Sequence, residues 1–205
     1  MRISRRKALS SALALGATTA LLAGRVRGER SSPPPADRIR PPGALAEAGF
    51  LDACVRCGLC VRACPYDVLR LADLGERVPA GTPYFVAREQ ACRMCEDIPC
   101  VPACPSGALV PSLVDVREAR MGVADLSDAK RCLSYSGAAY CHACFQACPV
   151  KGEAIHMQQG RTAGGGLIRP VVDPDRCTGC GLCEQACVLD GEAAITVRAN
   201  HVAQR

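Results

Sequence analysis

Sixteen cysteines dominate this chain of 205 residues, and they fall into four groups of four. The first and fourth groups have the spacing C-x2-C-x2-C-x3-C, whereas the second and third carry insertions between the same positions. A proline follows the last cysteine of the first three groups, and Val188 follows the last cysteine of the fourth. The groups are Cys54, Cys57, Cys60, Cys64; Cys92, Cys95, Cys100, Cys104; Cys132, Cys141, Cys144, Cys148; and Cys177, Cys180, Cys183, Cys187.

The spacing of the first and fourth groups is typical of chains that hold cubane iron–sulfur clusters. Three thiolates on one tight loop can converge on three corners of a cluster, and backbone N–H groups of the loop can hydrogen-bond to its sulfur atoms. The fourth cysteine of such a run points away and ligates the partner cluster of a pair. Because the pattern recurs four times, we predict that all sixteen cysteines are iron ligands. The chain would then bind four [4Fe–4S] clusters and transfer electrons.

Two other uses of cysteine fit this spacing less well. Disulfide frameworks occur in exported proteins, but cysteines two residues apart and tripled in one short loop mostly cannot reach distant partners. A zinc ion takes four ligands, usually from two separate Cys-x2-Cys pairs, so a third thiol at the same interval would be superfluous. We therefore expect iron–sulfur clusters rather than disulfides or zinc.

A unit of about 40 residues repeats along the chain, which indicates repeated local structure. Cysteine groups lie between short apolar stretches, and we expect a short helix before the fourth cysteine of each group. The stretches are 84–86, 122–124 and 171–173 on the leading side, and 68–71, 108–110, 154–157 and 194–197 on the trailing side. Such stretches can pair into small antiparallel ribbons. We predict an α+β fold of two ferredoxin-like units, with short antiparallel strands and short helices around four [4Fe–4S] clusters.

The residues outside the cysteine groups divide into three segments. Residues 1–24 carry the pair Arg5-Arg6 and a weakly apolar run, as a twin-arginine export signal does. Clusters are inserted in the reducing cytoplasm, so export of the folded protein would preserve them, and we expect a periplasmic protein. The sequence leaves open whether the signal is cleaved or remains as a membrane anchor. Residues 25–42 form a proline-rich linker, 43–197 the iron–sulfur domain and 198–205 a short tail.

The charge balance depends on the export signal. The whole chain has a formal net charge of +5, but residues 1–30 contribute +6, so residues 31–205 sum to −1. Four oxidised clusters with their thiolates would bring the mature holoprotein to about −9. This acidity argues against nucleic-acid binding and favours an electron carrier that docks on basic patches of its redox partners.

Several stretches contain residues that cluster binding alone does not require, namely 39–44, 54–58, 81–88, 94–100 and 118–122. These stretches closely resemble the NapG/MauM family of periplasmic ferredoxin-type proteins, and the resemblance extends over residues 39–197. It implies an electron-transfer protein without a catalytic site of its own. For NapG-type members it implies a component of a quinol dehydrogenase. That component takes electrons from a membrane-embedded quinol-oxidising iron–sulfur protein and passes them towards periplasmic nitrate reductase, directly or through a c-type cytochrome.

From this resemblance we favour the nitrate system and keep two alternatives. One is a MauM-type electron-transfer or maturation protein of a methylamine dehydrogenase system, and the other is an iron–sulfur subunit of a molybdenum enzyme.

The order in which the groups pair has two candidate solutions. Simple duplication would pair groups one with two and three with four. The layout also resembles iron–sulfur subunits of respiratory enzymes, in which pairing is nested. From that resemblance, and because groups one and four share the regular spacing, we predict nested pairing. Cys64 would then ligate the cluster of Cys177, Cys180 and Cys183.

Overall fold

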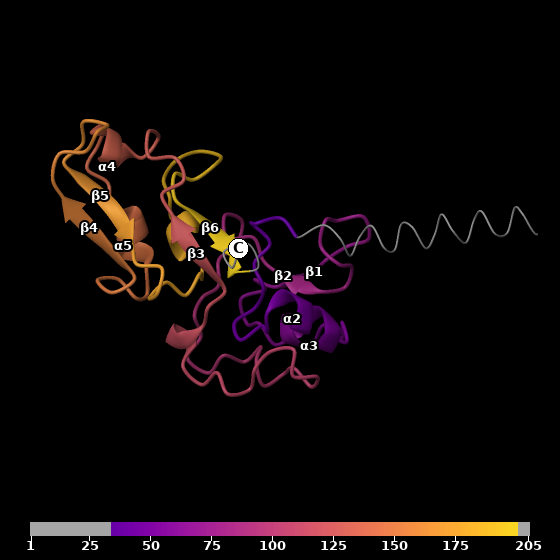
Figure 1. The fold of residues 1–205 in the computed structure, drawn as a ribbon. Helices are drawn as coiled ribbons and strands as arrows, with labels where there is room; N and C mark the ends of the chain where they lie inside the picture. The colour runs from indigo at the N-terminus through magenta and orange to yellow at the C-terminus, as the bar shows by residue number, and fades with distance from the viewer. Residues whose placement is uncertain (1–33, 201–205) are drawn as a thin grey trace, which may run out of the picture.

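The computed structural model of this protein describes residues 34–200, which form two halves (Figure 1). We call residues 34–120 the first half and residues 121–200 the second half. The predicted export signal, the beginning of the linker and residues 201–205 lie outside the described residues. Within residues 34–200, none of the helices has the length and apolar character that spanning a membrane requires.

Three short two-stranded antiparallel sheets organise the two halves, which confirms the expected antiparallel ribbons. The strand pairs are β1 (Arg70–Leu71) with β2 (Pro83–Tyr84), β3 (Gly122–Asp125) with β6 (Thr196–Ala199), and β4 (Ile155–Gln159) with β5 (Ile168–Val172). Every strand overlaps one of the apolar stretches seen in the sequence. Sheets this small are marginal by themselves, so their position depends on the packing around them.

Both halves have the same pattern of strand pairing. An inner hairpin joins the trailing stretch of one cysteine group to the leading stretch of the next, as β1–β2 in the first half and β4–β5 in the second. An outer pairing joins the two ends of each half, through the bridge between Ala44 and Leu109 in the first and through β3–β6 in the second. Because a hairpin folds the chain back on itself, each half brings two consecutive cysteine groups together.

The helices are short, and three of them begin one residue before the third cysteine of a group and end before the fourth. These are α3 (Leu59–Arg62), α5 (Ala143–Ala147) and α6 (Leu182–Gln185), in the first, third and fourth groups. The second group has turns where a helix was predicted, because Pro102 removes a backbone N–H donor that the helix would need. The other helical elements are α2 (Glu47–Ala53), the 3-10 helix η1 (Val116–Glu118) and α4 (Leu133–Ser136).

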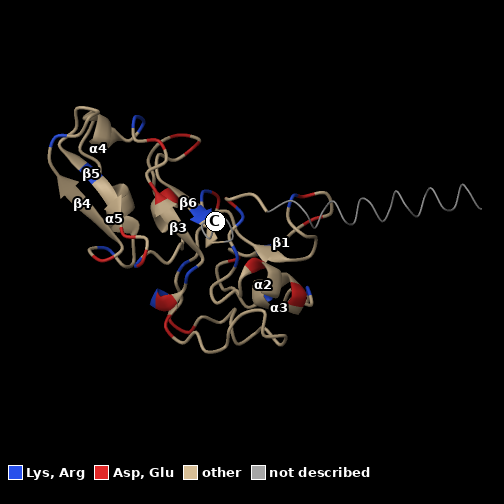
Figure 2. Cartoon of the chain, in the orientation of Figure 1, with Lys and Arg blue, Asp and Glu red and all other residues tan. Residues whose placement is uncertain are grey.

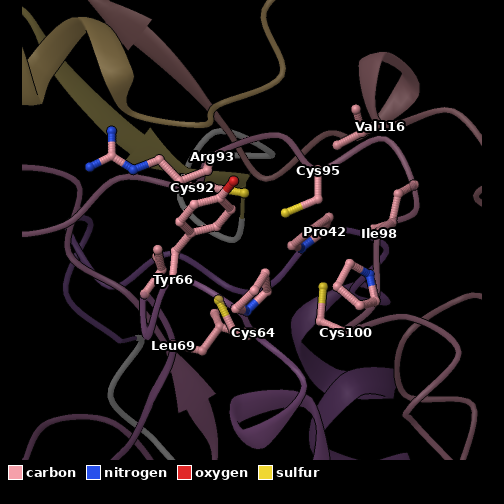
Figure 3. A pocket seen from close by; sticks show the side chains of 13 residues that line it. Pro42, Cys64, Tyr66, Leu69, Cys92, Arg93, Cys95, Ile98, Cys100 and Val116 are labelled. Atoms are coloured by element: carbon pink, nitrogen blue, oxygen red, sulfur yellow. The ribbon is translucent and has the colours of Figure 1, made fainter.

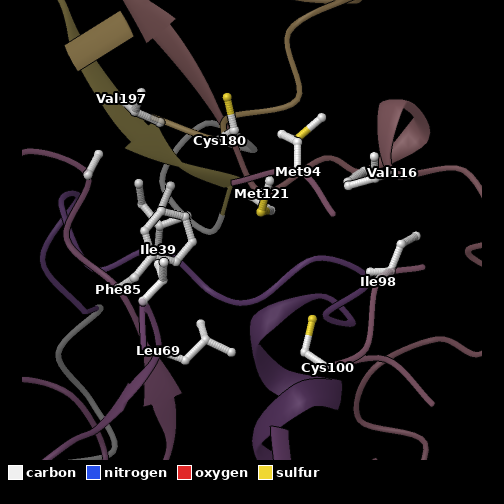
Figure 4. Close-up of a cluster of buried hydrophobic side chains, with 14 of the residues drawn as sticks. Ile39, Leu69, Phe85, Met94, Ile98, Cys100, Val116, Met121, Cys180 and Val197 are labelled. Carbon is white, nitrogen blue, oxygen red and sulfur yellow. The ribbon is translucent and has the colours of Figure 1, made fainter. Parts of the chain in front are cut away.

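A single large cluster of buried side chains joins the halves, and it contains cysteines as well as aliphatic residues. Figure 4 shows Ile39 and Phe85 of the first half in the same cluster as Met121, Cys180 and Val197 of the second. Aromatic residues make up only 3% of the chain, so few large side chains are available to fill this core. The loops that carry the cysteines therefore form much of the packed interior themselves.

The packed region begins earlier than the predicted boundary at residue 43. Ile39 is fully buried and pairs with Phe85 through two backbone hydrogen bonds of 2.9 Å. The buried guanidinium of Arg40 donates to the Glu47 carboxylate at 2.6 and 3.0 Å and lies over the ring of Phe50. The end of the predicted linker is therefore part of the domain. Strand β6 likewise continues to Ala199, beyond the predicted end at residue 197.

We expect Arg40→Met to destabilise the protein, because Glu47 would keep a largely buried charge without its partner. Removing one member of a buried ion pair costs about 3–5 kcal/mol. The Glu47 side chain keeps 16% of its surface exposed, so we expect the lower end of that range. Anaerobic guanidinium denaturation of the holoprotein, followed by circular dichroism, measures the change. Arg117→Met is the control, because its pair with Asp115 is exposed and contributes less than about 1 kcal/mol. Equal losses in the two variants would contradict this role of Arg40.

Candidate iron–sulfur sites

Site one is formed by the first three cysteines of group one together with the last cysteine of group two. Cys54, Cys57, Cys60 and Cys104 line one pocket of about 320 Å³. Between these cysteines, Arg56 and Gly58 have positive φ angles of 59° and 73°. Such left-handed turns let a short loop aim several groups at one point. Burial raises the pKa of Cys60 to about 11, and the nearby thiols of Cys54, Cys104 and Cys57 add to the rise.

Site two has the reciprocal composition. Cys92, Cys95 and Cys100 of group two line a pocket of about 400 Å³ with Cys64, the last cysteine of group one. In Figure 3 their sulfur atoms lie around a common space, beside Tyr66 and Ile98. Burial raises the pKa of Cys92 and of Cys100 to about 12 each, and neighbouring thiols, among them that of Cys64, add to both shifts.

Site three lies in the second half and again draws its fourth thiol from the following group. Cys132, Cys141, Cys144 and Cys187 line a pocket of about 370 Å³, whose walls include apolar side chains such as Ile195. Helix α4 follows Cys132, and helix α5 contains Cys144. Strand β5 supplies Pro170 to the wall of the pocket. Burial raises the pKa of Cys144 to about 11, with Cys132 and Cys141 adding to the rise.

Site four combines Cys177, Cys180 and Cys183 with Cys148, the last cysteine of group three. Burial raises the pKa of Cys148 to about 11, and the nearby thiols of Cys180 and Cys177 add to the rise. Burial also raises the pKa of Cys183 well above its ordinary value, and Cys180, Cys177, Cys144 and Cys148 contribute. Cys148 therefore lies with the group-four thiols, as Cys187 lies with those of group three.

The predicted nested pairing is wrong in this structure. Cys64 lies with Cys92, Cys95 and Cys100 rather than with the thiols of group four. The physical reason is the inner hairpin of each half, which returns the chain beside the preceding cysteine group before the second half begins. Equal spacing within groups one and four constrains the shape of each loop, but it does not bring the two loops together.

Several groups that the sequence analysis did not single out contact the thiols. The hydroxyls of Ser106 and Ser134 lie 3.6 and 3.3 Å from the sulfur atoms of Cys104 and Cys132, and the N–H of Ala124 donates to Cys177 at 3.5 Å. Burial alone would raise the pKa of Cys104, but hydrogen bonds from the backbone of Leu109 and from Ser106 outweigh it and lower that pKa. A serine two residues after a ligand cysteine was the one sequence signal for such contacts.

The thiols fit iron–sulfur clusters better than the two other uses of cysteine. All sixteen cysteines are free, so no disulfide framework exists. Among residues 34–200, no three His, Cys, Asp or Glu side chains converge closely enough to hold a single metal ion. Thiols around a cubane bind different iron atoms and stand further apart than ligands of one zinc ion, so four thiols around a larger space suit a cluster. Thiolates are the binding form, so loading these buried thiols releases protons.

Charged side chains are scarce around the thiols. Figure 2 shows Lys, Arg, Asp and Glu mostly on helix surfaces and outer loops. Arg56 is the one charged residue that lines site one, Arg93 the one that lines site two, and site three has none. One carboxylate acts on a thiol of site two, since the charge of Asp97 adds to the rise in the pKa of Cys95 that burial causes. Arg56 and Arg93 are exposed at the rim, where their charge would stabilise a reduced cluster.

Comparison with known proteins identifies the class of this chain. Residues 53–108 and 139–190 match the 4Fe-4S dicluster domain. Each match covers most of one half, in agreement with pairing inside the halves. No solved structure matches the chain. The protein is therefore an iron–sulfur protein of the dicluster type.

Comparison with individual relatives shows to which family within this class the chain belongs. The methylamine utilization ferredoxin-type protein MauM of Methylorubrum extorquens is 50% identical over 196 residues, which cover 95% of this chain and 88% of that protein. MauM of Paracoccus denitrificans is 46% identical over 96% of this chain and 88% of its own length. Ferredoxin-type protein NapG of Escherichia coli is 51% identical over 76% of this chain and 68% of its own length. The chain belongs to this MauM/NapG family of ferredoxin-type proteins.

Paired substitutions should separate cysteines that serve one site from cysteines that serve two. Cys64 and Cys95 lie at site two, so Cys64→Ala/Cys95→Ala should lose about as much iron as either single variant. Cys64 and Cys177 lie at different sites, so Cys64→Ala/Cys177→Ala should lose about twice as much. Iron and acid-labile sulfide per chain, measured on anaerobically purified protein, provide the comparison. Nested pairing requires the reverse result for the two double variants.

Proposed function

We propose that this protein is a periplasmic electron carrier that holds four [4Fe–4S] clusters in two ferredoxin-like units. The observation that carries the proposal is the grouping of thiols into sites one to four, with the fourth thiols exchanged inside each half. Exchange of the fourth cysteine between two clusters is a property of two-cluster ferredoxins. We assign all sixteen cysteines, in these four sets, as the iron ligands.

The side chains around the thiols keep each site apolar and fix the ligands in position. Ile98 and Val116 at site two, and Leu126 and Ile195 at site three, are wall residues that exclude water. Hydrogen bonds to sulfur, such as that from Ala124 to Cys177, set the potential together with burial. When bound, a [4Fe–4S] cluster accepts and releases single electrons. These roles need no nucleophile or acid–base pair, which is consistent with a carrier rather than an enzyme.

We assign the carrier first to a methylamine-utilisation system. Four MauM relatives align over 77–96% of this chain with 46–56% identity, whereas three NapG relatives align over 76–78% with 51–52% identity. The nitrate system, which the sequence analysis favoured, is the second candidate, because NapG is 51% identical within its aligned part. In that case a membrane-embedded quinol-oxidising iron–sulfur protein would supply electrons, and a c-type cytochrome or nitrate reductase would accept them.

Electron exchange with purified partners tests the carrier role and distinguishes these systems. We expect oxidised holoprotein, mixed anaerobically with methylamine dehydrogenase and its c-type cytochrome, to show bleaching of cluster absorbance that depends on methylamine. Reduced holoprotein mixed with periplasmic nitrate reductase, cytochrome and nitrate should recover its absorbance only if the second assignment holds. Metal-free protein is the control in both mixtures. Intact clusters that exchange electrons in neither mixture would contradict the carrier role in both systems and favour a maturation role or a molybdenum-enzyme subunit.

The periplasmic location depends on the twin-arginine pair, which lies outside the described residues. We expect Arg5→Lys/Arg6→Lys to leave the protein in the cytoplasm with its clusters loaded, because the folded export route requires the arginine pair. Arg25→Lys/Arg27→Lys, which conserves charge in the same segment, is the control and should be exported. Cell fractionation with immunoblotting measures the distribution. Normal export of the Arg5/Arg6 variant would rule out this signal, and recovery of exported protein with membranes would identify a retained anchor.

A further inference from the structure

The two halves meet where a ligand loop of site two touches a ligand loop of site four. The backbone N–H of Cys92 donates a 2.9 Å hydrogen bond to the carbonyl of Cys180. A ligand residue of one half is thus bonded directly to a ligand residue of the other.

Further hydrogen bonds fasten the two loops together on either side of this contact. The buried hydroxyl of Thr178 lies 3.6 Å from the sulfur of buried Met94, next to Cys95. The guanidinium of Arg88 donates to the carbonyls of Glu184 and Cys187 at 2.9 Å each and also contacts those of Leu189 and Gly191. The planar guanidinium has five N–H donors, so it can bind several carbonyl groups at once. Arg88 therefore holds the segment after Cys183 against the first half.

The close approach of the loops also requires small residues. A Cβ atom placed on Gly181 would collide with the Cβ of Ala87, and Gly181 has a positive φ of 85°. Within the second half, the same loop packs against β3, because a Cβ on Gly179 would overlap the backbone of Gly122. Ala87 and Ala91 are almost fully buried on the facing side. The contact is thus closed by backbone and methyl groups, with no room for a larger side chain.

Inside each half, the two sites are also neighbours. In the first half, the short helix α3 begins beside Cys60 of site one and leads to Cys64 of site two. In the second half, α5 contains Cys144 of site three and leads to Cys148 of site four, and α5 packs against α6, which carries Cys183. These two links and the Cys92–Cys180 contact connect the four sites, and each joins one pair.

We infer that the four sites form one path in the order one, two, four, three, with the Cys92–Cys180 contact as the junction between the halves. This order differs from the order along the sequence, in which group three precedes group four. Sites one and three are then the terminal sites, where redox partners exchange electrons with the protein. Exposure of the thiols agrees with this assignment, because Cys57 at site one is an exposed cysteine, whereas Cys177, Cys180 and Cys183 at site four are buried. The inference rests on the proposed electron-carrier function.

Selective removal of clusters tests the order. Cys57→Ala/Cys141→Ala removes a ligand from sites one and three and keeps sites two and four intact. We expect its reduced form to show a split electron paramagnetic resonance spectrum, since reduced clusters at two neighbouring sites couple magnetically. Cys95→Ala/Cys183→Ala keeps sites one and three, and its spectrum should be the sum of two separate signals. Splitting in the second variant and none in the first would overturn the order.

Substitutions at the junction test its role without changing a ligand. We expect Ala87→Val, and Gly181→Ala if it loads its clusters, to reduce the splitting between sites two and four while iron content stays unchanged. Gly75→Ala is the matched control, because Gly75 has a similar φ of +93° but no atom within 4 Å of an added Cβ and lies away from the junction. Unchanged splitting in Ala87→Val would overturn the role of this packing in setting the distance between the halves.

The outcomes separate this inference from the proposed function. Coupled clusters at sites two and four in a protein that exchanges electrons with none of the tested partners would support the order and contradict the carrier role. Electron exchange in a protein whose sites two and four are uncoupled would support the carrier role and overturn the order.

Discussion

The exchange of the fourth cysteine between neighbouring groups is the constraint on which the rest of this structure depends. Cys104 lies with the first three thiols of group one, and Cys64 lies with those of group two. The second half repeats the exchange with Cys187 and Cys148. Each cluster would therefore cross-link two loops that are distant in sequence. The small antiparallel ribbons orient these loops, and the cross-links replace the large aromatic core that the chain lacks.

The contact between the halves is also formed without large side chains. Glycine and alanine at the junction allow the loops of Cys92 and Cys180 to touch through their backbones. Backbone carbonyls at the end of α6 are paired at that contact, because Arg88 donates hydrogen bonds to them. A larger side chain would fill space but would separate the two ligand loops. At this contact, the two ligand loops therefore lie close together at the expense of hydrophobic packing.

Much of the fold could be predicted from local patterns, and the errors have identifiable causes. The strands lie in or beside the predicted apolar stretches because each pairs with a stretch close in sequence, as β4 does with β5. The helix expected in group two is absent because Pro102 lies between Cys100 and Cys104, and the effect of this proline was visible in the sequence. The burial of Ile39 and Arg40 was not visible, because proline-rich sequence near them is equally compatible with an extended tether.

The spacing of cysteines predicts the proposed ligands and the type of cofactor, because convergence of three thiols is a property of one short loop. Which loops face each other is a different kind of information. It depends on hairpins and on contacts between residues far apart in the chain, such as Cys92 with Cys180 and β3 with β6. The spacing of cysteines within a group carries no information about such contacts, so the sequence was compatible with nested and with adjacent pairing. The structure has adjacent pairing because the inner hairpin of each half brings consecutive cysteine groups together, and the junction sets the order of the four sites.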